Sequence, residues 1–219
     1  GEINRAMNVI AGSCTSIGTK PVFKEPTMTL NYVECHDNMT LFDKIMLSNK
    51  CESLETRLKR QKMITALILV SQGIAFLHAG QEFNRTKDGD HNSYTSPDSV
   101  NKLDWDRKDE YIETVEFVKG FIKLRKELKA LRLNTAEEIK KHVTVRSLEN
   151  RVIEYTISNV QAYGPYEEIK VFMNPTHTSI DIKLKDDYQL IANQAGVLTE
   201  QNSVNELTVD SIELVVLAK

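Results

Sequence analysis

Residues 34–38 have the sequence Glu-Cys-His-Asp-Asn and bring two carboxylates, an imidazole and an amide together. They follow a short β-prone run, 28–33, and are therefore predicted to lie where a strand ends. In parallel α/β architectures, catalytic side chains gather on loops at the carboxyl ends of strands. Alternation along a continuing strand would separate Asp37 from Glu34 and His36, whereas a bend would let several of them converge. Spacing alone favours a solvated loop with an Asx turn over a catalytic site.

A long polar segment, 80–94, follows the next predicted strand. Loops of this length inside a compact domain are typically either functional or disordered. The amides and carboxylates of the segment, with Arg85, His91 and Tyr94, suit a sugar, because its hydroxyls need donors and acceptors and its ring needs an aromatic face. The residues alone support sugar binding and a solvated surface loop equally. A metal site is a further alternative, but its donor set matches no EF-hand or zinc spacing: Asp88, Asp90, His91 and Asn92.

Helical patterns alternate with short apolar strands before residue 130. A helix is predicted over 54–71, with Ser53 as its cap and a mostly buried second half. Residues 74–77 are predicted to form a fully buried strand, and His78 after it is interpreted as a structural histidine. A second helix over 110–129 carries an apolar stripe at spacings of four, three and four: Phe117, Phe121, Leu124 and Leu128. Strand–helix–strand–helix order is typical of a parallel α/β sheet or barrel, and two strands cannot close a barrel.

The pattern changes to a period of two beyond residue 140. Short runs of alternating apolar residues predict strands around 143–145, 153–157, 169–173, 180–184, 190–191 and 212–216. Turns are predicted at 149–150, 164–165 and 186–187. Several short strands separated by turn signals at this spacing predict a small antiparallel β-sandwich.

Composition excludes some classes of function. The 28 Lys and Arg against 31 Asp and Glu give a formal net charge of −3, which argues against a nucleic-acid partner. The longest apolar run, 63–70, is too short to span a bilayer, so no membrane partner is expected. Three cysteines without metal spacing are interpreted as reduced thiols, which favours a cytoplasmic location; one disulfide and a secreted parent protein stay open as alternatives. A chain that begins at Gly1 without a leader is expected to be a processed product or a fragment.

Two stretches resemble a known family. Residues 31–45, Asn-Tyr-Val-Glu-Cys-His-Asp-Asn-Met-Thr-Leu-Phe-Asp-Lys-Ile, resemble the fourth conserved segment of the α-amylase superfamily, specifically its bacterial type I pullulanase branch. Residues 72–87, with His-Asn-Ser-Tyr at 91–94, resemble the eighth-strand region of the same enzymes. The departures from the branch pattern are modest: Cys35, Met39, Phe42 and Asp88.

The resemblance implies α/β plus all-β architecture. Residues 1–130 would be the last β/α units of an incomplete catalytic (β/α)8 barrel, and 131–219 a C-terminal antiparallel β-sandwich domain. The implied activity is retaining hydrolysis of α-1,6-glucosidic linkages in pullulan and branched α-glucans, which needs an Asp nucleophile, a Glu acid/base and a third Asp. The third Asp and its neighbouring His correspond to Asp37 and His36. The implied substrate-binding residues are Asn38, Arg85, Asp90, Asn92 and Tyr94.

The nucleophile and the acid of the family find no counterpart in this sequence, so the chain alone is expected to be inactive. The implied partners are an α-glucan such as pullulan or a limit dextrin, and the remaining N-terminal part of the parent enzyme. Unpartnered barrel strands would expose apolar surface, so self-association is also expected. No cofactor or metal is implied; calcium stays an open alternative, although no motif indicates it. The alternative hypothesis is a non-catalytic α-glucan-binding or interaction module.

Overall fold

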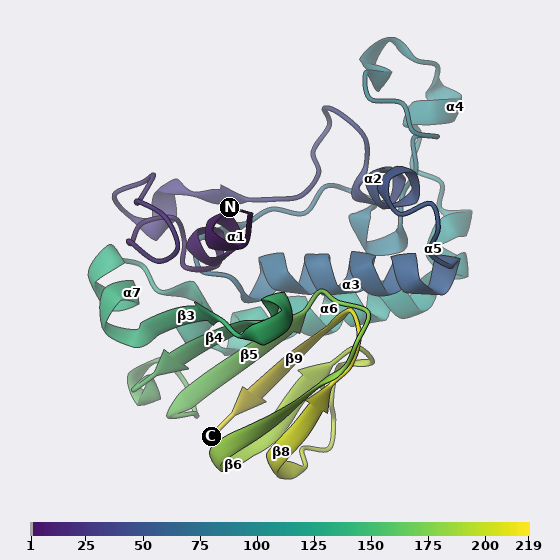
Figure 1. Cartoon of the computed structure of the whole chain (residues 1–219). Helices are drawn as coiled ribbons and strands as arrows, with labels where there is room; N and C mark the ends of the chain where they lie inside the picture. The colour runs from purple at the N-terminus through teal and green to yellow at the C-terminus, as the bar shows by residue number, and fades with distance from the viewer. Residues whose placement is uncertain (1) are drawn as a thin grey trace.

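The computed structural model describes residues 2–219. Two long helices, α3 (Leu54–Val70) and α6 (Ile112–Glu127), lie side by side between a pair of short parallel strands and an antiparallel sheet (Figure 1). The parallel strands are β1 (Leu30–Asn31) and β2 (Ile74–Ala75). The remaining helices of the first part connect these elements: α1 (Glu2–Ile10), η1 (Pro26–Met28), α2 (Leu41–Ser48), η2 (Gln81–Phe83), η3 (Ser93–Thr95), α4 (Asp98–Asn101) and α5 (Asp106–Glu110).

Parallel pairing of the two predicted strands is confirmed. Leu30 lies opposite Ile74 and Asn31 opposite Ala75, although each strand is shorter than its predicted run. The prediction of a fully buried second strand is wrong, because Ile74 is 47% exposed. The pair forms a sheet of only two strands, so within residues 2–219 nothing covers the apolar side chains on its open side.

The helix predicted over 54–71 is present as α3. The Ser53 hydroxyl caps it by accepting a hydrogen bond from Thr56 N at 3.2 Å, and its second half is buried as expected. The chain leaves the helix through Gly73, whose φ of 92° lies in the left-handed region. A Cβ at this position would come within 2.1 Å of the Thr29 hydroxyl oxygen, so a glycine is required for β2 to lie against β1.

The second predicted helix is also confirmed in α6. Its predicted apolar stripe is buried in the core: Phe117, Phe121, Leu124 and Leu128. The rings of Phe117 and Phe121 stack with centroids 4.7 Å apart. The sequence analysis missed α7 (Ala136–His142), although Thr135 and Glu138 form a capping box that the Thr-x-x-Glu spacing signals.

Seven antiparallel strands form the second part of the chain. They run in the spatial order β3-β4-β5-β9-β6-β7, with β8 beside β6. Their bounds are β3 (Val143–Ser147), β4 (Ile153–Ser158), β5 (Glu168–Asn174), β6 (Ile180–Asn193), β7 (Gly196–Val197), β8 (Ser203–Val209) and β9 (Glu213–Ala218). The predicted turn at 186–187 is wrong: β6 continues through it and pairs with β8 on both sides of an irregular register between Lys183 and Tyr188. Pairing with β9 begins only at Gln189.

Both faces of this sheet are apolar. One face packs on α3 and α6 (Figure 1). On the other face, Phe172 of β5 and Val215 of β9 pack in one cluster with Tyr188 of β6 and Val209 of β8. The second part of the chain is therefore one antiparallel sheet with an apolar cluster on each face, and the predicted division into a sandwich of two sheets stays a prediction.

The main core crosses the predicted domain boundary at residue 130, since a single apolar cluster extends from Met7 to Ala218. Buried Gln72 makes polar contacts across the same boundary: its amide nitrogen donates to the Tyr155 hydroxyl at 2.8 Å, and its side-chain oxygen accepts from Leu133 N at 2.9 Å. The division into 1–130 and 131–219 stays a prediction.

The three cysteines are unpaired in the structure. Among residues 2–219, no helix combines the length and the apolar character that a bilayer crossing requires.

Candidate functional site

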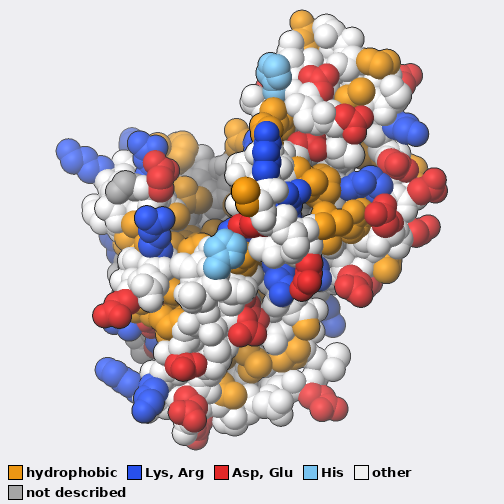
Figure 2. Space-filling view, turned by 45° about the vertical axis from the view of Figure 1, so that its right-hand side comes forward, with side chains coloured by type: hydrophobic (Ala, Val, Ile, Leu, Met, Phe, Trp, Pro, Cys, Tyr) orange, Lys and Arg blue, Asp and Glu red, His pale blue; other side chains and the backbone are white. Residues whose placement is uncertain are grey.

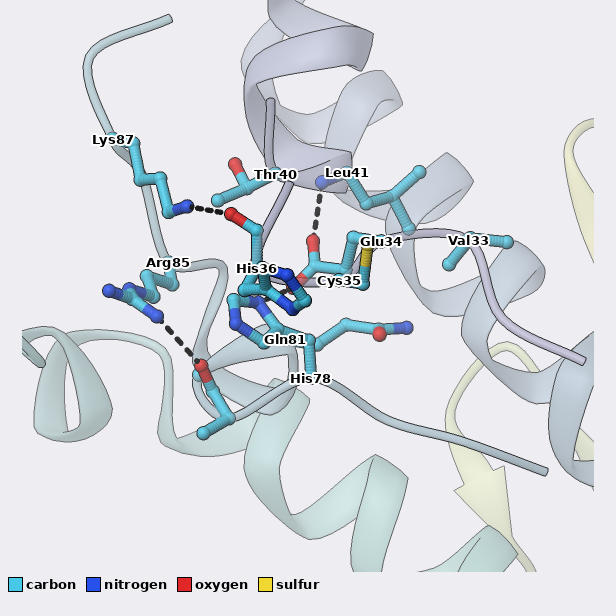
Figure 3. A network of polar contacts seen from close by, with 12 residues as sticks. Val33, Glu34, Cys35, His36, Thr40, Leu41, His78, Gln81, Arg85 and Lys87 are labelled. Atoms are coloured by element: carbon cyan, nitrogen blue, oxygen red, sulfur yellow. Dashed lines mark hydrogen bonds and ion pairs between the residues drawn. The ribbon is translucent and has the colours of Figure 1, made fainter. Parts of the chain in front are cut away.

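The predicted catalytic loop connects β1 to α2, and a buried carboxylate holds it at its start. The Glu34 side chain is inside the protein, with the residue 2% exposed. Its Oε1 lies 3.2 Å from Nδ1 of His78, and its Oε2 accepts a hydrogen bond from the backbone N–H of Leu41, the first residue of α2 (Figure 3). Glu34 therefore links the ends of both parallel strands to the start of the following helix.

The loop after β2 holds the middle of this loop. Lys87 Nζ donates to the backbone oxygen of His36 at 2.8 Å (Figure 3). Lys87 itself is fixed by buried Asp43 of α2, whose carboxylate accepts from Lys87 N at 2.8 Å and from the Thr86 hydroxyl at 2.5 Å. Two loops far apart in sequence are thus joined into one rigid unit at the carboxyl ends of β1 and β2.

His36 and Asp37 extend from this unit into solvent. Their side chains are 87% and 74% exposed, and Nε2 of His36 lies 3.5 Å from a carboxylate oxygen of Asp37. Asn38 follows with a φ of 62°, a left-handed conformation that asparagine tolerates and that turns the chain toward α2. An exposed carboxylate and imidazole on a fixed backbone can bind the hydroxyls of a ligand and stabilise positive charge beside it.

The buried surroundings of Glu34 and His78, below this loop, favour the uncharged form of each side chain. Burial raises the pKa of the Glu34 carboxyl to about 7, and the Leu41 N–H and the charges of Lys44 and Arg85 only partly oppose this rise. Burial also lowers the pKa of His78, as do the positive charges of Arg85, Lys87 and His36. The contact between the two groups is a hydrogen bond of 3.2 Å, and His78 has the structural role that its sequence context indicated.

Glu34 does not act as a second catalytic carboxylate beside Asp37, because it is buried and both of its oxygens are occupied by the protein. Glycoside hydrolysis by the common mechanism needs a pair of carboxyl groups flanking the scissile bond. This loop exposes one, Asp37.

Arg85 lies close to the buried pair but is itself buried. Its guanidinium donates to the backbone oxygens of Ala79 and Asn101, which holds the turn after β2 against the end of α4 (Asp98–Asn101). Figure 3 shows it beside Lys87 on the same loop. A substrate-binding role for Arg85 stays a prediction.

Asp90, Asn92 and Tyr94 lie on the segment around η3 and α4, which stands off the body as a lobe (Figure 2). Asp90 accepts from Asn92 N at 2.8 Å and from the Ser96 hydroxyl at 2.5 Å, and these hydrogen bonds lower the pKa of its carboxyl. Tyr94 is 84% exposed and offers an open aromatic face. Among residues 2–219, no hydrogen bond or ion pair joins these three residues to Asp37, so their joint role stays a prediction.

The sequence analysis missed the residues that fix the two loops: Asp43, Thr86 and Lys87. Lys87 falls inside the stretch that resembles the eighth-strand region, but its partner is a backbone oxygen, which leaves no pattern in sequence. Within the part of the chain that the structure describes, no three His, Cys, Asp or Glu side chains gather as a metal site would require.

Comparison with known proteins agrees with this architecture. A family model described as "pullulanase, all-beta domain" matches residues 139–195, which begin in α7 and extend through β6. A pullulanase of Bacillus subtilis is 35% identical over 221 residues, which cover 99% of this chain and 31% of that protein. The chain is a homologue of the pullulanases.

Solved pullulanase structures show the same fold. A type I pullulanase from Bacillus subtilis, complexed with maltose, superposes with a TM-score of 0.93 at 35% identity, over 97% of this chain and 30% of that one. A pullulanase from Anoxybacillus, complexed with maltotetraose, gives a TM-score of 0.88 at 37% identity, over 97% and 30% of the two chains. The chain thus spans less than a third of the length of these pullulanases, which are glycoside hydrolases.

Proposed function

We propose that this chain forms part of the active site of a debranching glycoside hydrolase, which cleaves α-1,6-glucosidic linkages in pullulan and branched α-glucans with retention of configuration. The observation that carries the proposal is the exposed His36–Asp37 pair, held on a rigid loop at the carboxyl ends of two parallel strands. This is the position at which parallel α/β enzymes place their catalytic groups.

Asp37 acts by binding a sugar hydroxyl next to the reacting carbon. Positive charge develops at the anomeric carbon as the glycosidic bond breaks, and a hydrogen bond to the ionised Asp37 then strengthens. His36, 3.5 Å from the carboxylate, binds a neighbouring hydroxyl and keeps the carboxylate oriented. The hydrogen bonds of both side chains to the substrate are stronger in the transition state than in the ground state, which is the condition for raising the rate.

The nucleophile and the acid/base come from a further segment that completes a (β/α)8 barrel with β1 and β2. The open side of the strand pair supports this proposal, because it leaves large apolar residues uncovered: Leu30 at 53%, Tyr32 at 51% and Ile74 at 47% exposure. Apolar strand residues of this size are normally covered, and neighbouring barrel strands would cover them.

The proposed substrate is an α-glucan. The maltose and maltotetraose complexes of the two homologous pullulanases support this class of ligand. In the present chain, the polar lobe would contribute further sugar contacts: its exposed Tyr94 offers a face for a sugar ring, and Asn92 and Asp90 offer donors and acceptors for hydroxyls.

A second candidate function is α-glucan binding without catalysis by this chain alone. The single exposed carboxylate of the loop favours it, because one carboxyl group binds sugar but does not complete a hydrolytic pair.

The test joins this chain to the upstream two-thirds of Bacillus subtilis pullulanase, replacing the homologous C-terminal region; we call this protein the intact hydrolase. Release of reducing ends from pullulan by the intact hydrolase, with none from the chain alone, would support the proposal. A folded intact hydrolase that binds maltotetraose without cleaving pullulan would favour the second candidate.

A further inference from the structure

The loop that carries His36 and Asp37 is fixed at both of its ends by one side chain. Glu34 stands at the start of the loop, and its carboxyl group accepts the N–H of Leu41, where the loop ends and α2 begins. The other carboxyl oxygen lies 3.2 Å from His78 Nδ1, directly after β2. One buried group therefore closes the loop on itself and attaches it to the neighbouring strand.

The other contacts of the loop are consistent with a preformed geometry. Lys44 Nζ donates to Val33 O at 3.2 Å just before the loop, and Thr40 caps α2 by accepting from Asp43 N at 3.1 Å. The His36 and Asp37 side chains make no contact that would hold the backbone in place, since both extend into solvent. Their positions depend on the buried groups underneath.

We propose that Glu34 is a positioning residue for the transition-state contact of Asp37, acting through the closed loop without touching the substrate. This inference rests on the function proposed above. It assigns to Glu34, the buried carboxylate of the Glu-Cys-His-Asp-Asn motif, a role other than acid/base chemistry, because its burial excludes that chemistry.

The geometry distinguishes two substitutions. Glu34→Gln keeps one acceptor oxygen for Leu41 N and places an amide toward His78, whose Nδ1 accepts in one tautomer, so the loop stays closed. Glu34→Ala removes both contacts and leaves the loop attached mainly through Lys87. A misplacement of about 1 Å in a catalytic group costs on the order of 100-fold in rate.

The experiment measures kcat and KM on pullulan, and thermal unfolding, for four variants of the intact hydrolase: Glu34→Ala, Glu34→Gln, Asp37→Asn and Glu52→Ala. Glu52 is the control, because its side chain is only 12% exposed and pairs with Arg60 at 2.5 Å, and among the described residues its side chain bonds to none of residues 34–41. We expect Glu34→Ala to lower kcat by about 100-fold with KM changed less than about threefold. We expect Glu34→Gln to restore kcat to within about tenfold of the parent, and Glu52→Ala to lower only the unfolding temperature.

The outcomes separate this inference from the proposed function. Suppose that the unsubstituted intact hydrolase is active, that Asp37→Asn is inactive, and that Glu34→Ala folds and keeps the unsubstituted kcat. The positioning role of Glu34 is then overturned, while the proposed function stands. A kcat that falls equally in Glu34→Ala and Glu34→Gln also overturns it, because closure of the loop would then not be the relevant property. If Glu34→Ala does not fold, Glu34→Asp replaces it, because its shorter side chain cannot reach both partners. A loss of kcat in Glu34→Asp with unchanged kcat in Glu34→Gln then supports the positioning role. Unchanged kcat in both variants overturns it. An inactive parent overturns the function and this inference with it.

Discussion

Lys87 Nζ donates a 2.8 Å hydrogen bond to the backbone oxygen of His36, joining two loops that lie 51 residues apart in sequence. The ammonium group is part-buried, so the contact is not a mobile surface interaction. It fixes the backbone between the two ends held by Glu34. The catalytic proposal depends on this arrangement, because the side chains that would touch the substrate are exposed and the groups that place them are not.

Replacement of Lys87 by methionine tests this contact. Methionine fills a similar volume but leaves the His36 oxygen without its donor, so residues 35–40 should exchange their amide hydrogens faster. We expect kcat of the intact hydrolase on pullulan to fall by about tenfold. Lys119→Met is the control, since within residues 2–219 the Lys119 side chain bonds only to exposed Glu116. Unchanged exchange and unchanged kcat in Lys87→Met would contradict the anchoring role.

Stability of the chain should depend on pH through Glu34. Its pKa rises from 4.5 to about 7 in the folded state, so the protonated form is favoured there and the stabilisation is lost as pH rises from about 4.5 through about 7. The full shift corresponds to about 3 kcal/mol. Other charged or titratable groups lie near the same carboxyl: His78, Lys44, Arg85 and Asp43. Comparison with the Glu34→Gln variant at each pH separates the contribution of Glu34 to stability from the contributions of these groups.

Urea unfolding of the wild-type chain and Glu34→Gln at pH 5 and pH 8 measures this dependence. The free energy of unfolding of the wild type, relative to Glu34→Gln, should be lower at pH 8 than at pH 5. A difference that does not change with pH, or that grows toward pH 8, would show that the carboxyl is not desolvated as its burial implies.

Gln72 should contribute more to stability than the hydroxyl it contacts. Tyr155→Phe removes one partner of the Gln72 amide, which still donates to Ala130 O, and should cost about 1 kcal/mol. Gln72→Ala also leaves Leu133 N and Ala130 O without their side-chain partner inside the core, and should cost about 3 kcal/mol. Urea unfolding measures the loss of unfolding free energy in both variants. Equal losses would contradict the prediction that Gln72 stabilises the core through several partners besides the Tyr155 hydroxyl.

The chain alone should self-associate through the open side of its parallel strands. Ile74 is 47% exposed there beside exposed Leu30 and Tyr32, so the apparent mass from light scattering should rise with concentration. Ile74→Lys should reduce this rise. Leu54→Lys should not, because Leu54 has the same 47% exposure but lies at the start of α3. Equal effects of the two substitutions would contradict the strand pair as the contact surface.

Local periodicity predicted the elements whose burial is complete within this chain. The stripe from Phe117 to Leu128 and the capped helix after Ser53 are present because their partners, the sheet and the neighbouring helix, are part of the same chain. Ile74 has the same apolar character, yet it is 47% exposed, because the sheet formed by β1 and β2 has no third strand within residues 2–219. Asp186 and Asp187 look like a turn, but β6 continues through them, since it pairs with β8 both before and after an irregular register between Lys183 and Tyr188.

The sequence predicted the exposed residues of the candidate site but not the contacts that hold its loop in place. The motif placed His36 and Asp37 after a strand, and both are exposed on that loop. In contrast, the Lys87 side chain donates to the backbone oxygen of His36, and the backbone N–H of Leu41 donates to Glu34. Each contact involves one backbone group, so it depends on how the loops pack and leaves no clear pattern of residue types. Glu34 appeared as one of several polar residues, and only its burial separates its positioning role from the role of Asp37.

The most direct test of the proposed function is turnover of pullulan by the intact hydrolase carrying Asp37→Asn. The amide keeps the size of the side chain but removes the negative charge that stabilises the developing cation. Turnover should fall by several orders of magnitude, on the order of 10³-fold or more, with an unchanged unfolding temperature because the side chain is exposed. Turnover close to that of the parent in the folded variant would contradict the assignment of Asp37 and, with it, the proposed catalytic role of this loop.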